Sequence, residues 1–202
     1  MSISGALFDM NKLLDVSKNV IATYSPDRIY KDVMQWAQIY NKKLADFLSD
    51  KDYALSIFSI ERDENGSKRK DIAKWSDVEN YLFYFIDENW NAQNCKEKLL
   101  SEYNLETVNK VLDLFVNKYY CETDDNEAWF EKMKCLSEEV GYAREVKLWR
   151  KNKDLWPGHV GNICAVVRIA LTGLNTTPDL YQVIRALGTD RIKNRLLKVI
   201  NS

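Results

Sequence analysis

Apolar residues recur every three or four positions along most of the chain, and almost no segment alternates apolar and polar residues as a half-buried strand would. The stretch 9–24 carries such a stripe. So does the stretch that begins at Ser25-Pro26 and runs to Phe47, where a serine N-cap precedes a proline at the first helical position. The apolar run 52–60 is too short for periodicity to separate helix from strand, and its helical neighbours favour a helix. We therefore predict an all-α protein of about nine or ten helices.

Polar residues 87–94 divide the helical pattern into two parts. We expect a helical domain over residues 1–90 and a second one over residues 91–202. The remaining helices are expected at 77–86 after a Ser76 cap, 95–102, 105–119, 124–140 after a Thr123 cap and before Gly141, and 143–151. The loop 62–70 is polar, with Asn65-Gly66 at its turn.

Most of the strong backbone signals lie between Trp156 and Leu196. Val160 to Thr172 is almost wholly apolar, which is typical of a helix that is buried nearly all round. Gly173 stands where a left-handed residue would close that helix. Thr177 before Pro178 predicts a second helix start, Gly188 its end, and Thr189 the cap of a third helix.

This arrangement predicts a loop, 173–177, held between two helix ends, with Arg168 on the first helix. Unpaired amides at a helix start attract anions and polar ligands, so such a corner is suited to a phosphate or the edge of a base. A tight turn with a purely structural role would have the same sequence, and the pattern alone leaves both interpretations open.

The composition is that of a folded, soluble protein, with 46% hydrophobic and 29% charged residues. No apolar run approaches the roughly eighteen residues of a membrane helix, and the N-terminus does not resemble a signal peptide, so we expect no membrane partner and a cytoplasmic location. Four cysteines without C-x-x-C spacing and a single histidine favour reduced core thiols and no metal site.

The net charge of −1 hides an asymmetry. From Arg144 to the C-terminus there are 11 Lys and Arg against 4 Asp and Glu, whereas the preceding 143 residues carry 18 against 26. This division favours a polyanionic partner for the C-terminal part. A patchwork surface without a partner is the alternative.

The sequence lacks the groups of common catalytic sites. His159 is the only histidine, and there is neither a Walker loop nor a G-x-G-x-x-G motif. His159-Val160-Gly161-Asn162 is similar to the H-x-G-H nucleotide motif of class I synthetases, but no strand precedes it and the second histidine is absent. We interpret it as a helix-start turn.

One long motif resembles a known family. R-I-A-L-T-G-L-N-T-T-P-D-L-Y-Q-V-I-R-A-L-G-T-D-R, preceded by G-H-V-G-N, is similar to the C-terminal signature of bacterial glutamyl-tRNA synthetases, where it belongs to the anticodon-binding domain. The similarity continues through G-Y-A-R-E-V-K and R-K-D-I-A-K-W-S-D-V to G-A-L-F-D-M-N-K-L-L, so it covers nearly the whole chain. D-V-S-K-N-V-I stands where the family usually has W-x-N in the helix 9–24.

The resemblance implies roles for particular residues. It places Arg168, Thr177, Pro178 and Leu180 at anticodon-contacting positions. It also places either Lys68 or Arg69 against the third anticodon base, with the pairing ambiguous by one position. The basic C-terminal helix is then expected to neutralise phosphates through Arg191, Lys193, Arg195 and Lys198.

In that family the segment S-G-A-L-F-D follows the catalytic domain directly, which implies that the chain is the C-terminal portion of a longer enzyme or a separately encoded domain. The implied partners are tRNA(Glu) and the chain's own N-terminal catalytic domain, and residues 1–90 would form a connecting domain similar to a stem-contact domain. ATP and Mg would be used by the catalytic domain, with no cofactor in this chain, and we expect a monomer. The alternatives are a helical protein-interaction module and a stand-alone tRNA-binding domain related to class I lysyl-tRNA synthetase.

Overall fold

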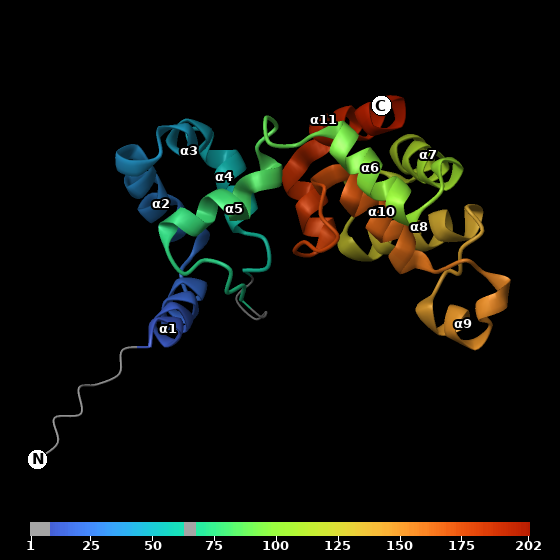
Figure 1. The fold of residues 1–202 in the computed structure, drawn as a ribbon, viewed down its shortest axis with the longest axis horizontal. Helices are drawn as coiled ribbons and strands as arrows, with labels where there is room; N and C mark the ends of the chain where they lie inside the picture. The colour runs from blue at the N-terminus through green and yellow to red at the C-terminus, as the bar shows by residue number, and fades with distance from the viewer. Residues whose placement is uncertain (1–8, 63–67) are drawn as a thin grey trace, which may run out of the picture. The chain divides into compact units, whose positions relative to one another are not determined.

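The computed structural model describes residues 9–62 and 68–202, so Met1–Phe8 and the expected Asn65-Gly66 turn lie outside the described residues (Figure 1). Within the described ranges there are eleven α-helices with short 3₁₀ and π segments. The same ranges hold no strand beyond one isolated bridge between Ala143 and His159. The all-α prediction is confirmed.

The chain forms two compact units, one up to Phe83 and one from Tyr84 to Ser202. The division falls seven residues before the boundary expected at 90/91. Its physical basis is the segment 84–90, which is anchored to the second unit: the backbone carbonyl of Tyr84 and the carboxylate of Asp87 both accept hydrogen bonds from Arg195. The role of residues 1–90 as a connecting domain stays a prediction.

The first unit consists of α1 (Met10–Ala22), α2 (Pro26–Tyr40), α3 (Lys42–Phe47), α4 (Lys51–Phe58), the 3₁₀ turn η1 (Trp75–Asp77) and α5 (Val78–Leu82). As predicted, the Ser25 hydroxyl caps α2 by accepting from the Arg28 amide at 3.3 Å, and residues 51–58 are helical. The core is formed by fully buried residues of α2, α4 and the turn after α3, among them Ile29, Val33, Leu48, Ile57 and Phe58.

Two local predictions in the first unit are wrong. The helix expected from Pro26 to Phe47 breaks at Asn41, whose side chain accepts from the Leu44 amide at 3.1 Å and caps a new helix. Ser76 does not cap the helix that follows: Asp77 is the N-cap residue of α5 and makes no side-chain cap bond, because its carboxylate accepts from the preceding amides of Ala73 and Lys74 at 3.0 and 3.1 Å. In both places a short polar side chain competes with the backbone for its hydrogen bonds.

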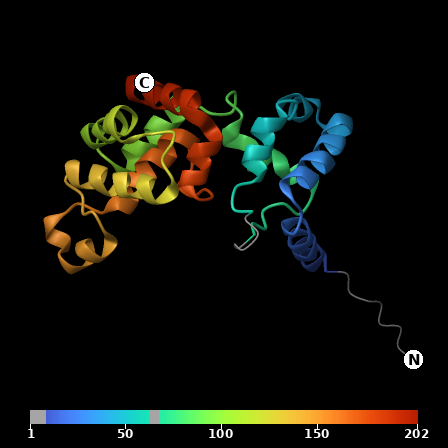
Figure 2. The same ribbon diagram turned by 180° about the vertical axis from the view of Figure 1, so that it is seen from behind.

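Four helices of the second unit pack around α10 (Val160–Thr172): α6 (Ala92–Glu102), α7 (Leu105–Leu114), α8 (Asn126–Glu139) and α11 (Leu180–Asn201) (Figures 1 and 2). A π-helical turn, η3 (Phe115–Tyr119), extends α7, and α9 (Val146–Lys151) and the 3₁₀ turn η4 (Lys153–Leu155) precede α10. Nine of the 13 residues of α10 are buried, which confirms the prediction of a helix enclosed nearly all round.

Two glycines shape the helix ends next to the predicted corner. Gly173 closes α10 in the left-handed conformation with φ 73°, as predicted. Gly188, with φ 75° and ψ 161°, breaks α11 where the sequence predicted a helix end.

Two predicted N-caps of this unit are wrong because an aspartate takes the role. Asp179 rather than Thr177 caps α11, since its carboxylate accepts from the Gln182 amide at 3.0 Å. Asp125 rather than Thr123 caps α8, since it accepts from the Ala128 amide at 2.8 Å. Aspartate and threonine are both good caps, so their order along the chain does not decide between them.

All four cysteines are free, but only Cys95 and Cys164 are buried, whereas Cys121 is exposed and Cys135 is half-buried. The expectation of core thiols therefore holds for two of the four. In the described part of the chain, no helix is both long enough and apolar enough to cross a membrane.

Candidate nucleic-acid interface

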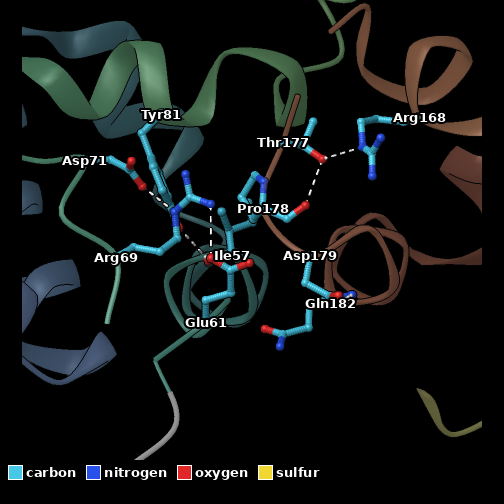
Figure 3. Close-up of polar contacts among 10 residues, drawn as sticks. All are labelled: Ile57, Glu61, Arg69, Asp71, Tyr81, Arg168, Thr177, Pro178, Asp179 and Gln182. Carbon is cyan, nitrogen blue, oxygen red and sulfur yellow. Dashed lines mark hydrogen bonds and ion pairs between the residues drawn. The ribbon is translucent and has the colours of Figure 1, made fainter. Parts of the chain in front are cut away.

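The corner between α10 and α11, here residues 168–179, brings together two of the predicted site residues. Arg168 is half-buried on α10, and its Nε donates to the hydroxyl of Thr177 at 3.2 Å (Figure 3). The same hydroxyl donates to the Pro178 carbonyl at 2.8 Å. Thr177 thus fixes the plane of the guanidinium group instead of capping α11.

The other end of the Arg168 guanidinium is free to bind. Among the described residues, neither terminal amino group of Arg168 has a hydrogen-bond or ion-pair partner. A pair with Asp179 would have given the arginine a structural role, but the Asp179 carboxylate faces the start of α11. An arginine that is oriented by one bond and keeps its paired N–H donors is suited to planar, bidentate recognition.

Side chains from distant parts of the unit satisfy the carbonyl groups at the end of α10, which a helix C-terminus leaves without partners. Trp90 Nε1 donates to the Ala170 carbonyl at 3.2 Å, Arg195 Nη1 to the Leu171 carbonyl at 2.7 Å, and Lys98 Nζ to the Gly173 carbonyl at 3.0 Å. These bonds anchor the backbone that carries Arg168.

The loop after Gly173 lies at the surface of the unit. Leu174, Asn175 and Thr176 are exposed, and the Asn175 side chain donates to Glu102 of α6 at 3.2 Å. The corner therefore presents a polar, supported surface next to Thr177.

Pro178 and Leu180 do not contribute to that surface as expected. Both are buried, and the Leu180 side chain is only 4% exposed because it packs into the core under α11. Of the predicted corner residues, only Arg168 and Thr177 are therefore partly exposed to solvent.

Comparison with known proteins decides the family. The model of the family described as "Anticodon binding domain" matches residues 69–200. The chain belongs to the anticodon binding domain family. It is 34% identical over 201 residues to the glutamate–tRNA ligase of Acetivibrio thermocellus, 35% over 202 to that of Clostridium perfringens strain SM101, and 32% over 200 to that of Sorangium cellulosum. These alignments cover 97 to 99% of the chain but only 34 to 36% of the relatives, so the chain spans about a third of their length.

Of the four cations expected to contact phosphates in this anticodon binding domain, Lys193 and Lys198 are exposed. Arg191 is 37% exposed at its side chain and pairs with Asp87 at 3.0 Å.

The expectation for Arg195 is wrong. Its residue exposure is 2%, and it donates to the carbonyls of Tyr84 and Leu171 and to Asp87, each at 2.7 Å. A signal was present in the sequence, because Arg195 lies three residues after Ile192 and four before Val199, within the apolar stripe of the helix.

Lys68 and Arg69 of the first unit differ in their environments. Arg69 forms ion pairs with Asp71 and, at 3.2 Å, with Glu61, and it lies 6.0 Å from the ring centre of Tyr81 (Figure 3). Burial lowers the pKa of Arg69, but the hydrogen bond to Asp71 and its charge outweigh this and leave the pKa raised. Lys68 is exposed, so of the two it is the cation accessible to a ligand.

The same cluster contains a buried phenol. The Tyr81 hydroxyl donates to the Ile57 carbonyl at 3.2 Å, and burial raises the pKa of Tyr81 to about 12. Tyr81 therefore stays neutral at physiological pH. Its ring lies beside Arg69 without forming an ion pair, so the Arg69 charge stays paired with Asp71 and Glu61.

Proposed function

We propose that this chain binds tRNA at the anticodon, as the anticodon-reading part of a glutamate–tRNA ligase, and that the cognate tRNA is tRNA(Glu). The attachment of glutamate with ATP and Mg would then take place in a catalytic part outside this chain, in the cytoplasm. The observation that carries the proposal is the Arg168 guanidinium, which Thr177 orients and whose terminal donors have no acceptor among the residues that the structure describes. Membership of the anticodon binding domain family and the similarity to two glutamate–tRNA ligases support it.

Recognition of a single-stranded base requires hydrogen bonds to the edge of an unstacked ring. The Arg168 amino groups supply a planar pair of donors, and a bidentate contact of this kind discriminates between bases by about 1–3 kcal/mol. Thr177 contributes by holding the guanidinium plane, and the exposed loop 174–176 leaves room for the base beside it. Lys193 and Lys198 would neutralise neighbouring phosphates without reading the sequence.

The test compares two RNAs, tRNA(Glu) and the same transcript with an altered anticodon, in a fluorescence-anisotropy titration. Arg168→Ala should weaken binding of the cognate RNA by about 5- to 150-fold and bring it close to the affinity for the altered RNA. Thr177→Val keeps the shape of the side chain but removes the hydroxyl, and should have a smaller effect in the same direction. Arg185→Ala, which removes an equal charge from an exposed position on α11, is the matched control.

The outcome on the two RNAs separates the possible roles of Arg168. Equal losses on both would show that Arg168 only neutralises phosphate, and the proposed base reading would be refuted. A preference for tRNA with a lysine anticodon would point to the alternative relationship with lysyl-tRNA synthetase. If the unaltered chain has no affinity for any tRNA at two salt concentrations, a protein-interaction module becomes the better interpretation.

A specific observation favours a protein contact in addition to RNA binding. One face of α1 exposes Met10, Leu13, Val16 and Val20, by 46 to 58%, next to a groove of about 540 Å³ that is also lined by Trp36 and Trp75. Because the matched ligases are almost three times as long as this chain, we propose that this face contacts the catalytic part of such a ligase. Val16→Asp should then weaken co-purification with that part, whereas self-association of the unaltered chain in light scattering would contradict both this contact and the expected monomer.

A further inference from the structure

A second basic surface lies at the other end of α10. Residues 144–157 of the second unit, here called the α9 arm, form a long loop between Ala143 and Gly158. The amide of Ala143 donates to the Gly158 carbonyl at 3.0 Å, and the Val160 amide donates to the Ala143 carbonyl at 2.9 Å. The two ends of the arm are thus held together by backbone hydrogen bonds. The arm projects from the rest of the unit in both ribbon views (Figures 1 and 2).

The base of the arm is also fixed by side chains. The buried hydroxyl of Ser137 donates to the Ala143 carbonyl at 2.9 Å. Arg144 pairs with Glu138 at 2.9 Å and with Glu131, so two carboxylates of the same unit neutralise its charge. The Trp149 ring lies 5.2 Å from the His159 ring and so packs the arm against the start of α10.

Beyond Arg144, the arm carries cations that the fold does not neutralise. All four are exposed, and among the described residues none has a carboxylate partner: Lys147, Arg150, Lys151 and Lys153. In contrast, Lys118, Lys132 and Lys134 on the neighbouring helices each form an ion pair. Lys153 also lies 5.3 Å from the Trp149 ring centre, a contact that leaves its charge in place. Four positive charges without a carboxylate partner within seven residues outweigh the two exposed carboxylates of the arm, Glu145 and Asp154, and concentrate a positive field on one short projection.

The field of the arm acts on its base as well. Burial and the nearby charge of Arg150 both lower the pKa of His159. The ring therefore stays neutral at physiological pH, and its Nδ1 accepts the Gly161 amide at 3.0 Å. The positive charge of the arm comes from its lysines and arginine alone.

The length of α10 sets the separation of the arm from the corner. The arm joins the helix at Val160 and Arg168 lies eight residues further along α10, so about 12 Å of helix axis separates the two positions at 1.5 Å per residue. The arm projects from the end of α10 that lies away from the corner. It is positioned for phosphates of nucleotides other than the one whose base Arg168 would contact.

We propose that the α9 arm is a second RNA contact, which binds the phosphodiester backbone of tRNA outside the bases read at the α10–α11 corner. The inference rests on the proposed function. Its chemistry is charge neutralisation without sequence reading, because flexible lysines on a projecting segment act as point charges.

The test uses the whole chain with the arm cations replaced by glutamine: Lys147→Gln, Arg150→Gln, Lys151→Gln and Lys153→Gln. For single-stranded RNA each neutralised phosphate contributes about 0.7 to the slope of log affinity against log salt, so the slope should become shallower by up to about 3. At low salt the variant should bind tRNA(Glu) at least about tenfold more weakly. It should lose the same factor for the anticodon-altered RNA, so that the discrimination between the two is unchanged.

The control removes four charges from the same unit at positions that are exposed or already paired: Lys110→Gln, Lys118→Gln, Lys132→Gln and Lys134→Gln. It should change tRNA affinity much less than the arm variant, and circular dichroism should show that both variants keep their helices. Nuclease footprinting of tRNA should lose protection outside the anticodon bases in the arm variant only.

The possible failures can be told apart. A control that loses as much affinity as the arm variant would reduce the effect to general charge and overturn the inference. The inference would also be overturned if the arm variant lost binding to phosphatidylserine vesicles but kept its affinity for tRNA. Binding of tRNA that the arm substitutions leave unchanged overturns this inference alone, whereas no tRNA binding by the unaltered chain overturns the proposed function and the arm contact with it.

Discussion

Arg195→Met tests whether the buried arginine of α11 stabilises the fold or contacts RNA. The methionine fills the space of the aliphatic stem and removes the guanidinium group, which lies 5.1 Å from the Trp90 ring centre. That group ties two other segments to α11: it donates to Tyr84 and Asp87 in the segment before α6, and to Leu171 at the end of α10.

The contacts of Arg195 set the expected loss in the free energy of unfolding. The carbonyls of Tyr84 and Leu171 each accept from Arg195 Nη1 at 2.7 Å, and both bonds are buried. A buried acceptor that loses its donor costs about 1–3 kcal/mol. Asp87 is 54% exposed at its side chain and keeps its contact with Arg191, so it adds little. With two such acceptors, we expect Arg195→Met to lower the free energy of unfolding by about 2–6 kcal/mol.

The assay compares Arg195→Met with Arg191→Met, which removes the same charge from the same helix and a contact to the same carboxylate. Because Arg191 is part of a surface pair, its loss should cost less than about 1 kcal/mol. Urea unfolding followed by circular dichroism gives the two free energies, and hydrogen exchange should show faster exchange at the end of α10 for Arg195→Met only. A structural role for Arg195 is refuted if the two variants are equally stable, or if Arg195→Met weakens tRNA binding at unchanged stability.

Three further predictions follow from single residues. Gly188→Ala should lower the free energy of unfolding by about 1–3 kcal/mol, because φ 75° with ψ 161° is a backbone conformation almost restricted to glycine. Gly173→Ala should lower it less, since an alanine in the left-handed region costs about 1 kcal/mol. Thermal unfolding that shows the reverse order of stabilities would contradict this. Cys121 should react with iodoacetamide well before Cys164 in mass-spectrometric mapping, because a hydrogen bond from Thr123 lowers the pKa of the exposed thiol whereas burial raises that of Cys164 to about 11. Although burial raises the pKa of Asp87, hydrogen bonds from Arg195 and Arg191 lower it overall, so the stability that Asp87 contributes is present above its unfolded pKa of about 3.9 and is lost as the pH falls further. The difference in unfolding free energy between the unaltered chain and Asp87→Asn should therefore shrink below about pH 4. A difference that stays constant with pH would contradict this prediction.

The sequence by itself determined the features that depend on neighbours along the chain. The helical period of apolar residues was sufficient for the all-α class and for the enclosed position of α10. The Ser25-Pro26 cap, the left-handed Gly173 and the break at Gly188 follow from the conformational preferences of single residues, and all three are present. The resemblance places Arg168 and the loop residue Thr177 at one site, and the structure brings them into contact through a hydrogen bond that the sequence did not predict.

Only the tertiary structure decided which charged side chains face solvent and which serve the fold. Arg195 and Lys193 are two positions apart and have the same charge, yet one is buried against carbonyls 24 and 111 residues away and the other is exposed. Lys98 and Trp90, which support the end of α10, carry no local signal, because their partners lie 75 and 80 residues away. The physical reason is that a carbonyl at a buried helix end must find a donor, and the donor is whichever side chain the packing of distant helices brings within reach.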